Sequence, residues 1–473
     1  MAAIEAPARA IIRLVLALAV SMLASPLYAQ AASPEGGDPT YNIVRYNDNF
    51  TYLSDPTKAV DFWDGIKYIP LGDGRFGPSY LSLGGELRER FESYINPNFG
   101  IKAPDSNAYL LHRLLLDADL HVNDYLRVFL QLGDMERLGN RGTPTTTDID
   151  KLDVMQGFVD LRAPTPLGDA PTLRVGQAEM EYGFQRLVAL REGPNVRRAF
   201  DGFRLSDALG GATINLFAVR PVVDNTGVFD DHANLNQSLW GGYLTVPVAG
   251  GLKADLYWMG YDNALGRFRN QTGFESRQTV GTRLFGAADG WDWNSEAALQ
   301  GGRFRNNDIR AWLLASIAGY TFRGLPWEPR LALEANAASG DSGHGTLGTF
   351  NALYPRLPYF AETPLLVPAN VYDIRPVISF KPMPVVTAVF GWDTLWRTSL
   401  HDGLYGSAET LFPGTNMTTG SRVGTELSAD VRWRLDRHLT LGAIFAELFA
   451  GPAVTEAGGK SVSYFVLFGT YRF

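Results

Sequence analysis

The chain has 473 residues, no cysteine and a formal net charge of −8. The lack of cysteine excludes disulfides, thiol catalysis, thiolate metal sites and a lipoprotein anchor, and the acidic balance argues against a nucleic-acid partner. Because mean hydropathy is −0.08, the apolar residues are dispersed along the chain rather than gathered in membrane helices.

The first residues have the pattern of a secretory signal peptide. Arg9 and Arg13 are followed by the apolar stretch Leu14 to Ala24, and small residues come after it. This stretch is about 11 residues long, shorter than the roughly 20 that a spanning helix needs, which disfavours the alternative of a retained anchor. We therefore expect residues 1–31 to be removed on export.

From Tyr80 onward the sequence alternates with a period of two. In the first such stretch, Leu87 and Phe91 fall on one face and Glu86, Arg88 and Arg90 on the other. Most of the stretches are close to the roughly 9 to 11 residues of a membrane-spanning strand. We expect about 18 of them, near residues 80–92, 109–122, 125–133, 154–163, 172–180, 199–205, 211–220, 237–247, 251–261, 276–286, 290–301, 309–322, 329–339, 371–381, 385–397, 420–435, 438–449 and 461–473.

The connections between these strands also alternate. Short ones such as 123–124 and 436–437 are followed by mostly longer ones, such as 181–198, 262–275 and 340–370. Outer-membrane barrels alternate short periplasmic turns with longer external loops in this way. The interpretation has one exception, because Pro376 lies inside an expected strand and a closed barrel has no edge strand to tolerate it.

The chain ends on an aromatic strand. A soluble protein seldom stops on an unpaired hydrophobic edge, whereas a barrel pairs its last strand with its first. We expect 461–473 to close on the strand that starts near Tyr80, with Tyr471 and Phe473 facing lipid, where the barrel-assembly machinery would recognise them, and Arg472 facing the lumen or the rim.

These patterns predict an all-β fold, a transmembrane antiparallel β-barrel of about 18 strands over residues 79–473. A signal peptide, 1–31, and an N-terminal segment, 32–78, precede it. That segment has mixed polarity and no clear period. It is therefore either a periplasmic extension or a plug-like segment inserted into the barrel mouth, and we favour the insertion.

The charged face of the strands must point inward, because an arginine or lysine facing lipid near the midplane costs roughly 2 to 4 kcal/mol. The arginines that we expect along the substrate path are Arg88, Arg90, Arg113, Arg127, Arg162, Arg174, Arg204, Arg283 and Arg432. The other cations assigned to this face are Lys253, Arg277, Arg310, Arg330, Arg375, Lys381, Arg397, Arg422 and Arg434. Cations outnumber acids on this face by about five, which favours an anionic solute; the alternative is that they form ion pairs across neighbouring strands.

Other chemistry has little support in the sequence. The stretch Gly340 to His344 contains a serine between glycines, as a hydrolase loop would, but such stretches are usually flexible turns. The six histidines show no metal-ligand spacing, and the acids of 148–153 and 230–231 could hold calcium but are more simply solvated loop charge. We expect no catalytic residue, no metal, no cofactor and no enzymatic activity.

Two motifs stand at neighbouring strands in the stretch from Leu173 to Leu205. One has the pattern R-x-G-x-x-x-x-x-Y-G and the other N-x-x-R-x-F-D-G-x-R-L. The matching residues are Arg174, Gly176, Tyr182 and Gly183, then Asn195, Arg198, Phe200, Asp201, Gly202, Arg204 and Leu205. In this stretch, in 45–70 and in the loop 340–355, the chain resembles the alginate export family of outer-membrane barrels. Where that family often has Arg-Gln, this chain has Gln177 and Ala178, which removes one lumen cation.

The resemblance implies an 18-stranded barrel in the outer membrane of a Gram-negative bacterium, with an arginine-rich constriction that passes polyanionic alginate. Our hypothesis is therefore a channel for an anionic polysaccharide, surrounded by outer-membrane lipid and lipopolysaccharide. The alternatives are an uptake porin for small anionic or aromatic solutes and, with less support, an outer-membrane hydrolase.

Overall fold

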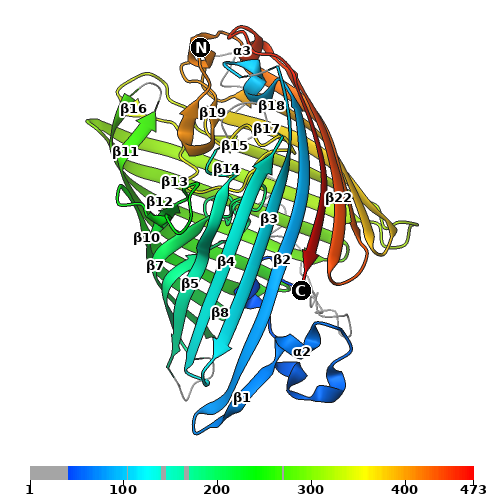
Figure 1. Ribbon diagram of the computed structural model, residues 1–473. Coiled ribbons are helices and arrows are strands. Elements are labelled where there is room, and N and C mark those ends of the chain that lie inside the picture. The colour runs from blue at the N-terminus through cyan, green and yellow to red at the C-terminus, as the bar shows by residue number, and fades with distance from the viewer. Residues whose placement is uncertain (1–40, 104, 140–144, 164–169, 269–270) are drawn as a thin grey trace.

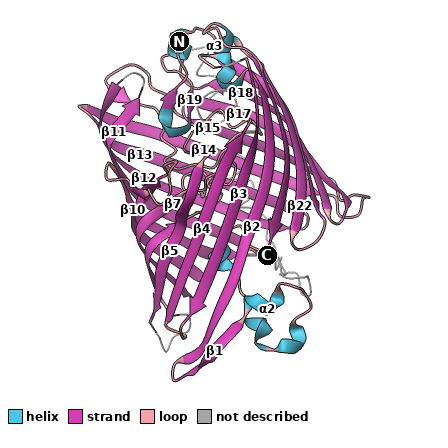
Figure 2. Ribbon diagram, viewed as in Figure 1, coloured by secondary structure: helices cyan, strands magenta, loops and turns pink. Residues whose placement is uncertain are grey.

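The computed structural model describes residues 41–103, 105–139, 145–163, 170–268 and 271–473. The expected signal peptide, 1–31, lies outside the described residues. The described part is a closed barrel of 18 antiparallel strands with almost no helix (Figures 1 and 2). Among the described residues, no helix is both long enough and apolar enough to cross a membrane.

The wall is formed by strands that match the predicted ones closely. They are β2 (Gly77–Ile95), β3 (Ser106–His121), β4 (Leu126–Leu138), β5 (Asp150–Arg162), β6 (Thr172–Glu179), β7 (Ala199–Leu209), β8 (Ala212–Val223), β10 (Gln237–Ala249), β11 (Leu252–Phe268), β12 (Gln271–Ala288), β13 (Trp291–Phe304), β14 (Asn307–Thr321), β15 (Arg330–Ala338), β17 (Val371–Met383), β18 (Val386–Arg397), β21 (Arg422–Arg434), β22 (Leu439–Ala450) and β23 (Val462–Arg472).

The short elements lie before the wall or between its strands. The short strands are β1 (Ile69–Gly74), β9 (His232–Ala233), β16 (Thr346–Leu347), β19 (Tyr405–Gly406) and β20 (Thr410–Leu411). The helical turns are η2 (Arg45–Asn47), η3 (Thr51–Ser54), η4 (Pro56–Lys58), α2 (Asp64–Lys67), η5 (Pro97–Gly100), η6 (Ser407–Glu409), η7 (Thr415–Met417) and α3 (Pro452–Thr455).

The connections define two ends of the barrel. At the turn end, short links such as 210–211 and 250–251 join neighbouring strands, and the C-terminus, α2 and the hairpin β1–β2 lie there (Figure 1). At the loop end, long segments such as 339–370 and 398–421 connect neighbouring wall strands. The prediction of a long loop over 262–275 was wrong, because β11 and β12 continue to pair past a bulge between Asn263 and Gly266.

The barrel closes as predicted, with β23 antiparallel to β2 from Glu86↔Arg472 to Ile95↔Ser463. The exception at Pro376 is accommodated locally. Its partner on β15 is Leu333, but on the other side the pairing with β18 stops at Ile374 and resumes at Val377 in the same register. Because proline has no backbone N–H to donate, the pairing between β17 and β18 is interrupted at Pro376 and then continues in the same register.

One expectation for the closing strand was wrong. Phe473 does not face lipid, because its ring stacks on Trp63 with centroids 4.4 Å apart and its backbone oxygen accepts a 2.8 Å hydrogen bond from Arg45. Trp63 also donates its indole N–H to the hydroxyl of Tyr471, at 2.8 Å. The C-terminal aromatics therefore pack against the N-terminal segment at the turn end.

Candidate channel lumen

The side-chain alternation separates an inner from an outer face on every wall strand. On β2, Glu86 is 0% exposed and Leu87 is 38% exposed, although the two are adjacent in sequence. The exposed apolar residues of the other strands, such as Phe203, Leu299 and Trp392, form the same kind of outer band. The buried polar residues line the interior, so the barrel has an apolar outside and a charged inside, as a membrane requires.

A network of buried charges lies at mid-height in the lumen. Glu86 accepts hydrogen bonds from Arg113 at 2.7 and 2.9 Å, from Arg197 at 3.1 Å and from Arg472 at 2.8 Å. A second carboxylate, Glu192, bonds to Arg113 at 2.7 Å and also to Arg197. Two acids thus hold arginines from two wall strands and one loop in a single cluster.

Both Glu192 and Arg197 belong to the segment 180–198, which follows the short strand β6 and folds into the lumen. The Arg88 guanidinium donates to the backbone oxygens of Glu192 and Pro194, both at 2.9 Å. The Asn195 amide donates to three backbone oxygens of the wall and its neighbouring loop, at 2.9 to 3.3 Å. The segment is therefore anchored to β2, β3 and β4 by groups that the wall supplies.

The charges around the segment explain the ionisation of its own side chains. Burial opposes the charge of Glu192, but Arg113 and Arg197 outweigh it and lower the pKa of Glu192 to about 2. Burial, with the charge of Arg191, lowers the pKa of Arg198 to about 9. The carboxylate is therefore charged, and held in the cluster, over the whole physiological pH range.

A second segment, 348–370, meets the first inside the barrel. Tyr354 donates its N–H to the oxygen of Leu187, and its own oxygen accepts from the N–H of Ala189, both at 2.9 Å. Gly193 lies directly under this segment, because a Cβ there would come within 2.2 Å of the oxygen of Leu357. The two segments together form a layer across the middle of the lumen, which we call the inner layer.

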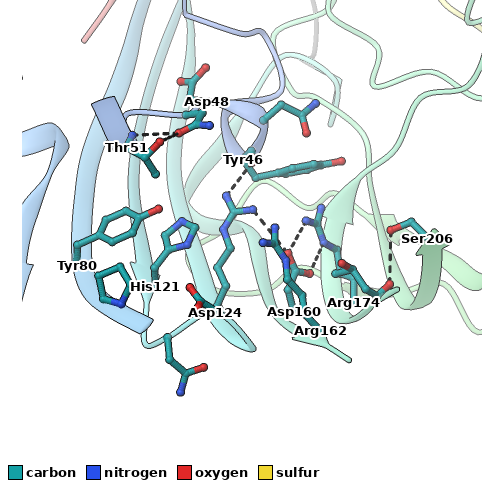
Figure 3. Close-up of a pocket in the computed structure, with 16 residues that line it drawn as sticks. Tyr46, Asp48, Thr51, Tyr80, His121, Asp124, Asp160, Arg162, Arg174 and Ser206 are labelled. Atoms are coloured by element: carbon teal, nitrogen blue, oxygen red, sulfur yellow. Dashed lines mark hydrogen bonds and ion pairs between the residues drawn. The ribbon is translucent and has the colours of Figure 1, made fainter. Parts of the chain in front are cut away.

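A polar cavity of about 450 Å³ lies on the turn-end side of the inner layer (Figure 3). Arg174 forms paired 2.8 Å hydrogen bonds with Asp160, and Arg127 bonds to Asp119 at 2.7 Å. Arg162 also lines the cavity, and no carboxylate of the described residues pairs with it. This cavity therefore has both neutralised and free cations on its wall.

Tyr46 of η2 reaches into this cavity from the N-terminal segment (Figure 3). Its ring packs edge-on against Phe129 and Phe158, and the Arg174 guanidinium lies 3.9 Å from its centroid. Its hydroxyl donates to the oxygen of Glu179 at 2.8 Å and accepts from Arg204 at 3.3 Å. The side chain is 6% exposed, so the cavity wall encloses it almost completely.

Another cavity, of about 410 Å³, lies on the loop-end side of the inner layer. Its wall includes Arg90, which bonds to Glu92 at 2.5 Å and to the Tyr464 hydroxyl at 2.8 Å. Arg191 and Arg198 of the inner layer also line it. The two cavities share no lining residue among the described ones, since the inner layer lies between them.

The arginines expected along the path all occupy inward positions of their strands. Most are paired with acids: Arg88 with Glu192, Arg90 with Glu92, Arg113 with Glu86 and Glu192, Arg127 with Asp119 and Asp160, Arg174 with Asp160, Arg283 with Asp255 and Arg432 with Asp430. In the described part of the chain, Arg162 and Arg204 have no carboxylate partner. Most of the expected path arginines are thus neutralised by ion pairs, several of them across neighbouring strands, as the alternative supposed. The two without a carboxylate partner lie in or beside the turn-end cavity.

Some residues were misassigned or missed. Arg310 was assigned to the lumen, but it is exposed on the outer face of β14, between the buried Ile309 and Ala311. The expectations gave no role to Tyr46 or Arg197, because both lie in segments without strand periodicity. For Arg197 the sequence gave a partial signal, since its neighbour Asn195 belongs to the motif quoted above.

This combination of an apolar exterior, a closed wall and a charged interior defines an outer-membrane channel protein. A family model described as alginate export matches residues 79–468. The chain belongs to the alginate export family, and its place is the outer membrane of a Gram-negative bacterium. No curated protein matches it.

Several solved structures share the fold at low identity. Pseudomonas aeruginosa OpdO is 11% identical with a TM-score of 0.58, over 83% of this chain and 97% of its own. Pseudomonas aeruginosa OccK11 (OpdR) is 14% identical with a TM-score of 0.55, over 83% and 96%. Pseudomonas aeruginosa OccK2 (OpdF), solved in complex with glucuronate, is 13% identical with a TM-score of 0.55, over 83% and 98%.

Proposed function

We propose that this channel passes anionic saccharides of the uronate class, up to a polyuronate such as alginate. The observation that supports this most is the turn-end cavity, where Arg162 has no carboxylate partner among the described residues; Arg204, also without such a partner, bonds to the hydroxyl of Tyr46 beside the cavity. Guanidinium groups suit carboxylates geometrically as well as by charge. The family description and the glucuronate in the structure of OccK2 point to the same solute chemistry.

The alternative is an uptake porin for small anionic or aromatic solutes. The inner layer supports it, because its two segments bond to each other and to the wall between the two cavities. A single uronate could step between pairs of arginines, whereas a polymer would have to displace the layer. In both cases the arginines act by attracting and orienting the solute.

We propose no catalytic function. Ser342, in the glycine-flanked stretch, is exposed, and no hydrogen bond joins its hydroxyl to a histidine in the described part of the chain.

We also propose that the N-terminal segment narrows the turn-end mouth, that lipopolysaccharide surrounds the loop end, and that the assembly machinery recognises the strand ending in Tyr471 and Phe473.

Planar-bilayer recordings of the purified channel test the proposal. In a salt gradient, the reversal potential is expected to show anion preference, and Arg204→Ala together with Arg162→Ala is expected to reduce it. Arg310→Ala, which removes an outward-facing cation, is the matched control and should leave the preference unchanged. Cation selectivity in the unmodified channel would contradict both the polyuronate and a small anionic solute.

Added uronates separate the two candidates. Passage of an oligouronate, detected on the far side of the bilayer, would support the polymer channel. Passage of glucuronate combined with block by the oligouronate would support the small-anion porin. If neither compound passes or blocks while chloride flows, the uronate assignment is wrong.

A further inference from the structure

The part of β5 near the loop end has no neighbouring wall strand on one side. β6 pairs with β5 only from Gly157 to Arg162, because the chain then turns into the lumen. The segment 221–236, which comprises the end of β8 and its connection to β10, covers this part of β5; we call it the loop 221–236. Lys151 forms a parallel bridge with Val228, and the Phe229 N–H lies 3.3 Å from the oxygen of Leu152.

Three carboxylates meet at this seam. Asp150 and Asp153 come from β5 and Asp231 comes from the loop 221–236, and one oxygen of each lies within 4.8 Å of the others. Asp153 accepts the N–H groups of Asp230 and Asp231 at 2.8 and 3.2 Å, which orients it toward the loop. Such a cluster by itself would be ordinary loop charge.

Asp150 distinguishes this cluster from ordinary loop charge. Its side chain is 0% exposed, and both of its carboxylate oxygens are buried without a hydrogen-bond partner. Burying an unpaired carboxylate costs several kcal/mol, so such groups are normally paired or bound to a metal. Among the described residues no arginine or lysine pairs with Asp150, so a bound cation would supply the charge that compensates it.

We propose that Asp150, Asp153 and Asp231 bind one divalent cation, Ca²⁺. The ion would link the loop 221–236 to the loop-end part of β5. Carboxylate oxygens are the ligands that a hard cation prefers, and the cluster offers no nitrogen or sulfur ligand for zinc. Ca²⁺ tolerates irregular geometry and completes its shell with carbonyl oxygens and water. This inference does not depend on which solute the channel passes.

Calcium titration of the full-length, detergent-purified protein after chelation tests the proposal. We expect one bound Ca²⁺ with a Kd of about 10⁻⁴ to 10⁻³ M, as in other extracellular calcium sites. Ca²⁺ should also slow chymotrypsin cleavage after the exposed Phe229 by about tenfold or more, because loop opening then requires release of the ion. Absence of both effects at up to about 5 mM CaCl₂ would overturn the proposal.

Asp150→Asn is expected to weaken Ca²⁺ binding by at least about tenfold, since the loss of a group that only orients a ligand already costs about 10- to 100-fold in metal affinity. It should also make the protein more heat-stable than the unmodified chain in chelator and less heat-stable in calcium, a reversal that a purely structural role would not produce. Asp231→Asn, in the loop, provides the same test if the strand variant does not fold. Asp308→Asn, at an exposed external turn, is the control. Wild-type affinity in both cluster variants would contradict the assignment.

Discussion

Replacing Tyr46 with alanine should release the N-terminal segment from the turn-end cavity. The ring is 6% exposed, lies edge-on against two phenylalanines and has Arg174 3.9 Å from its centroid. Truncating a buried aromatic side chain to alanine costs about 3 to 5 kcal/mol. At about 1.4 kcal/mol per factor of ten, the equilibrium between docked and undocked segment shifts by about 10²- to 4 × 10³-fold.

Single-channel recording and limited proteolysis measure this shift. We expect a larger and noisier conductance in Tyr46→Ala, together with faster cleavage between residues 41 and 68. Tyr46→Phe keeps the ring and loses only the two hydroxyl bonds, so its conductance should stay near that of the unmodified channel. Phe62→Ala, which removes an exposed ring from the same segment, is a second control. If Tyr46→Ala shows unchanged conductance and unchanged cleavage, the segment does not narrow the path.

Three further predictions concern the inner layer and its charges. Glu86→Gln should lower the stability to urea by about 3 kcal/mol, because it removes the carboxylate that pairs with Arg472 and one of the carboxylates that hold Arg113 and Arg197. Glu89→Gln, at an exposed site, should change the stability little, and equal effects of the two substitutions would contradict the role of the cluster. Asn195→Ala removes two hydrogen bonds to the wall and one to the loop before β5, and it should increase conductance by loosening the segment 180–198. A conductance equal to that of the unmodified channel would count against this anchor. The pKa of Glu192 is about 2, because, against its burial, neighbouring guanidinium groups stabilise the charged form. A lowered carboxylate pKa gives stability that is complete above the unfolded value of about 4.3 and is lost as the pH falls toward 2. The conductance should therefore change below about pH 4.5, and Glu192→Gln should remove that change. A change near pH 6 that Glu192→Gln abolishes would refute this.

The alternation of side chains accounts for how much of the wall could be predicted. A residue such as Leu87 must face lipid if Arg88 faces the lumen, and this requirement is local, repeated and independent of the partner strand. The strand positions, their number, the closure of β23 on β2 and the inward orientation of the path arginines all follow from it. Where the prediction was wrong, as at 262–275, glycine and asparagine resembled a loop although the pairing continued through a bulge.

The sequence by itself therefore determined the barrel, its charged interior and its resemblance to the alginate export family. It did not determine what lies inside the barrel. The inward fold of 180–198, the docking of Tyr46 and the choice of Glu86 as the partner of Arg113, Arg197 and Arg472 depend on contacts between residues far apart in sequence, in segments without periodicity. Because these contacts form only when the cylinder is closed, the tertiary structure alone decided which cations are neutralised and which are left for a solute.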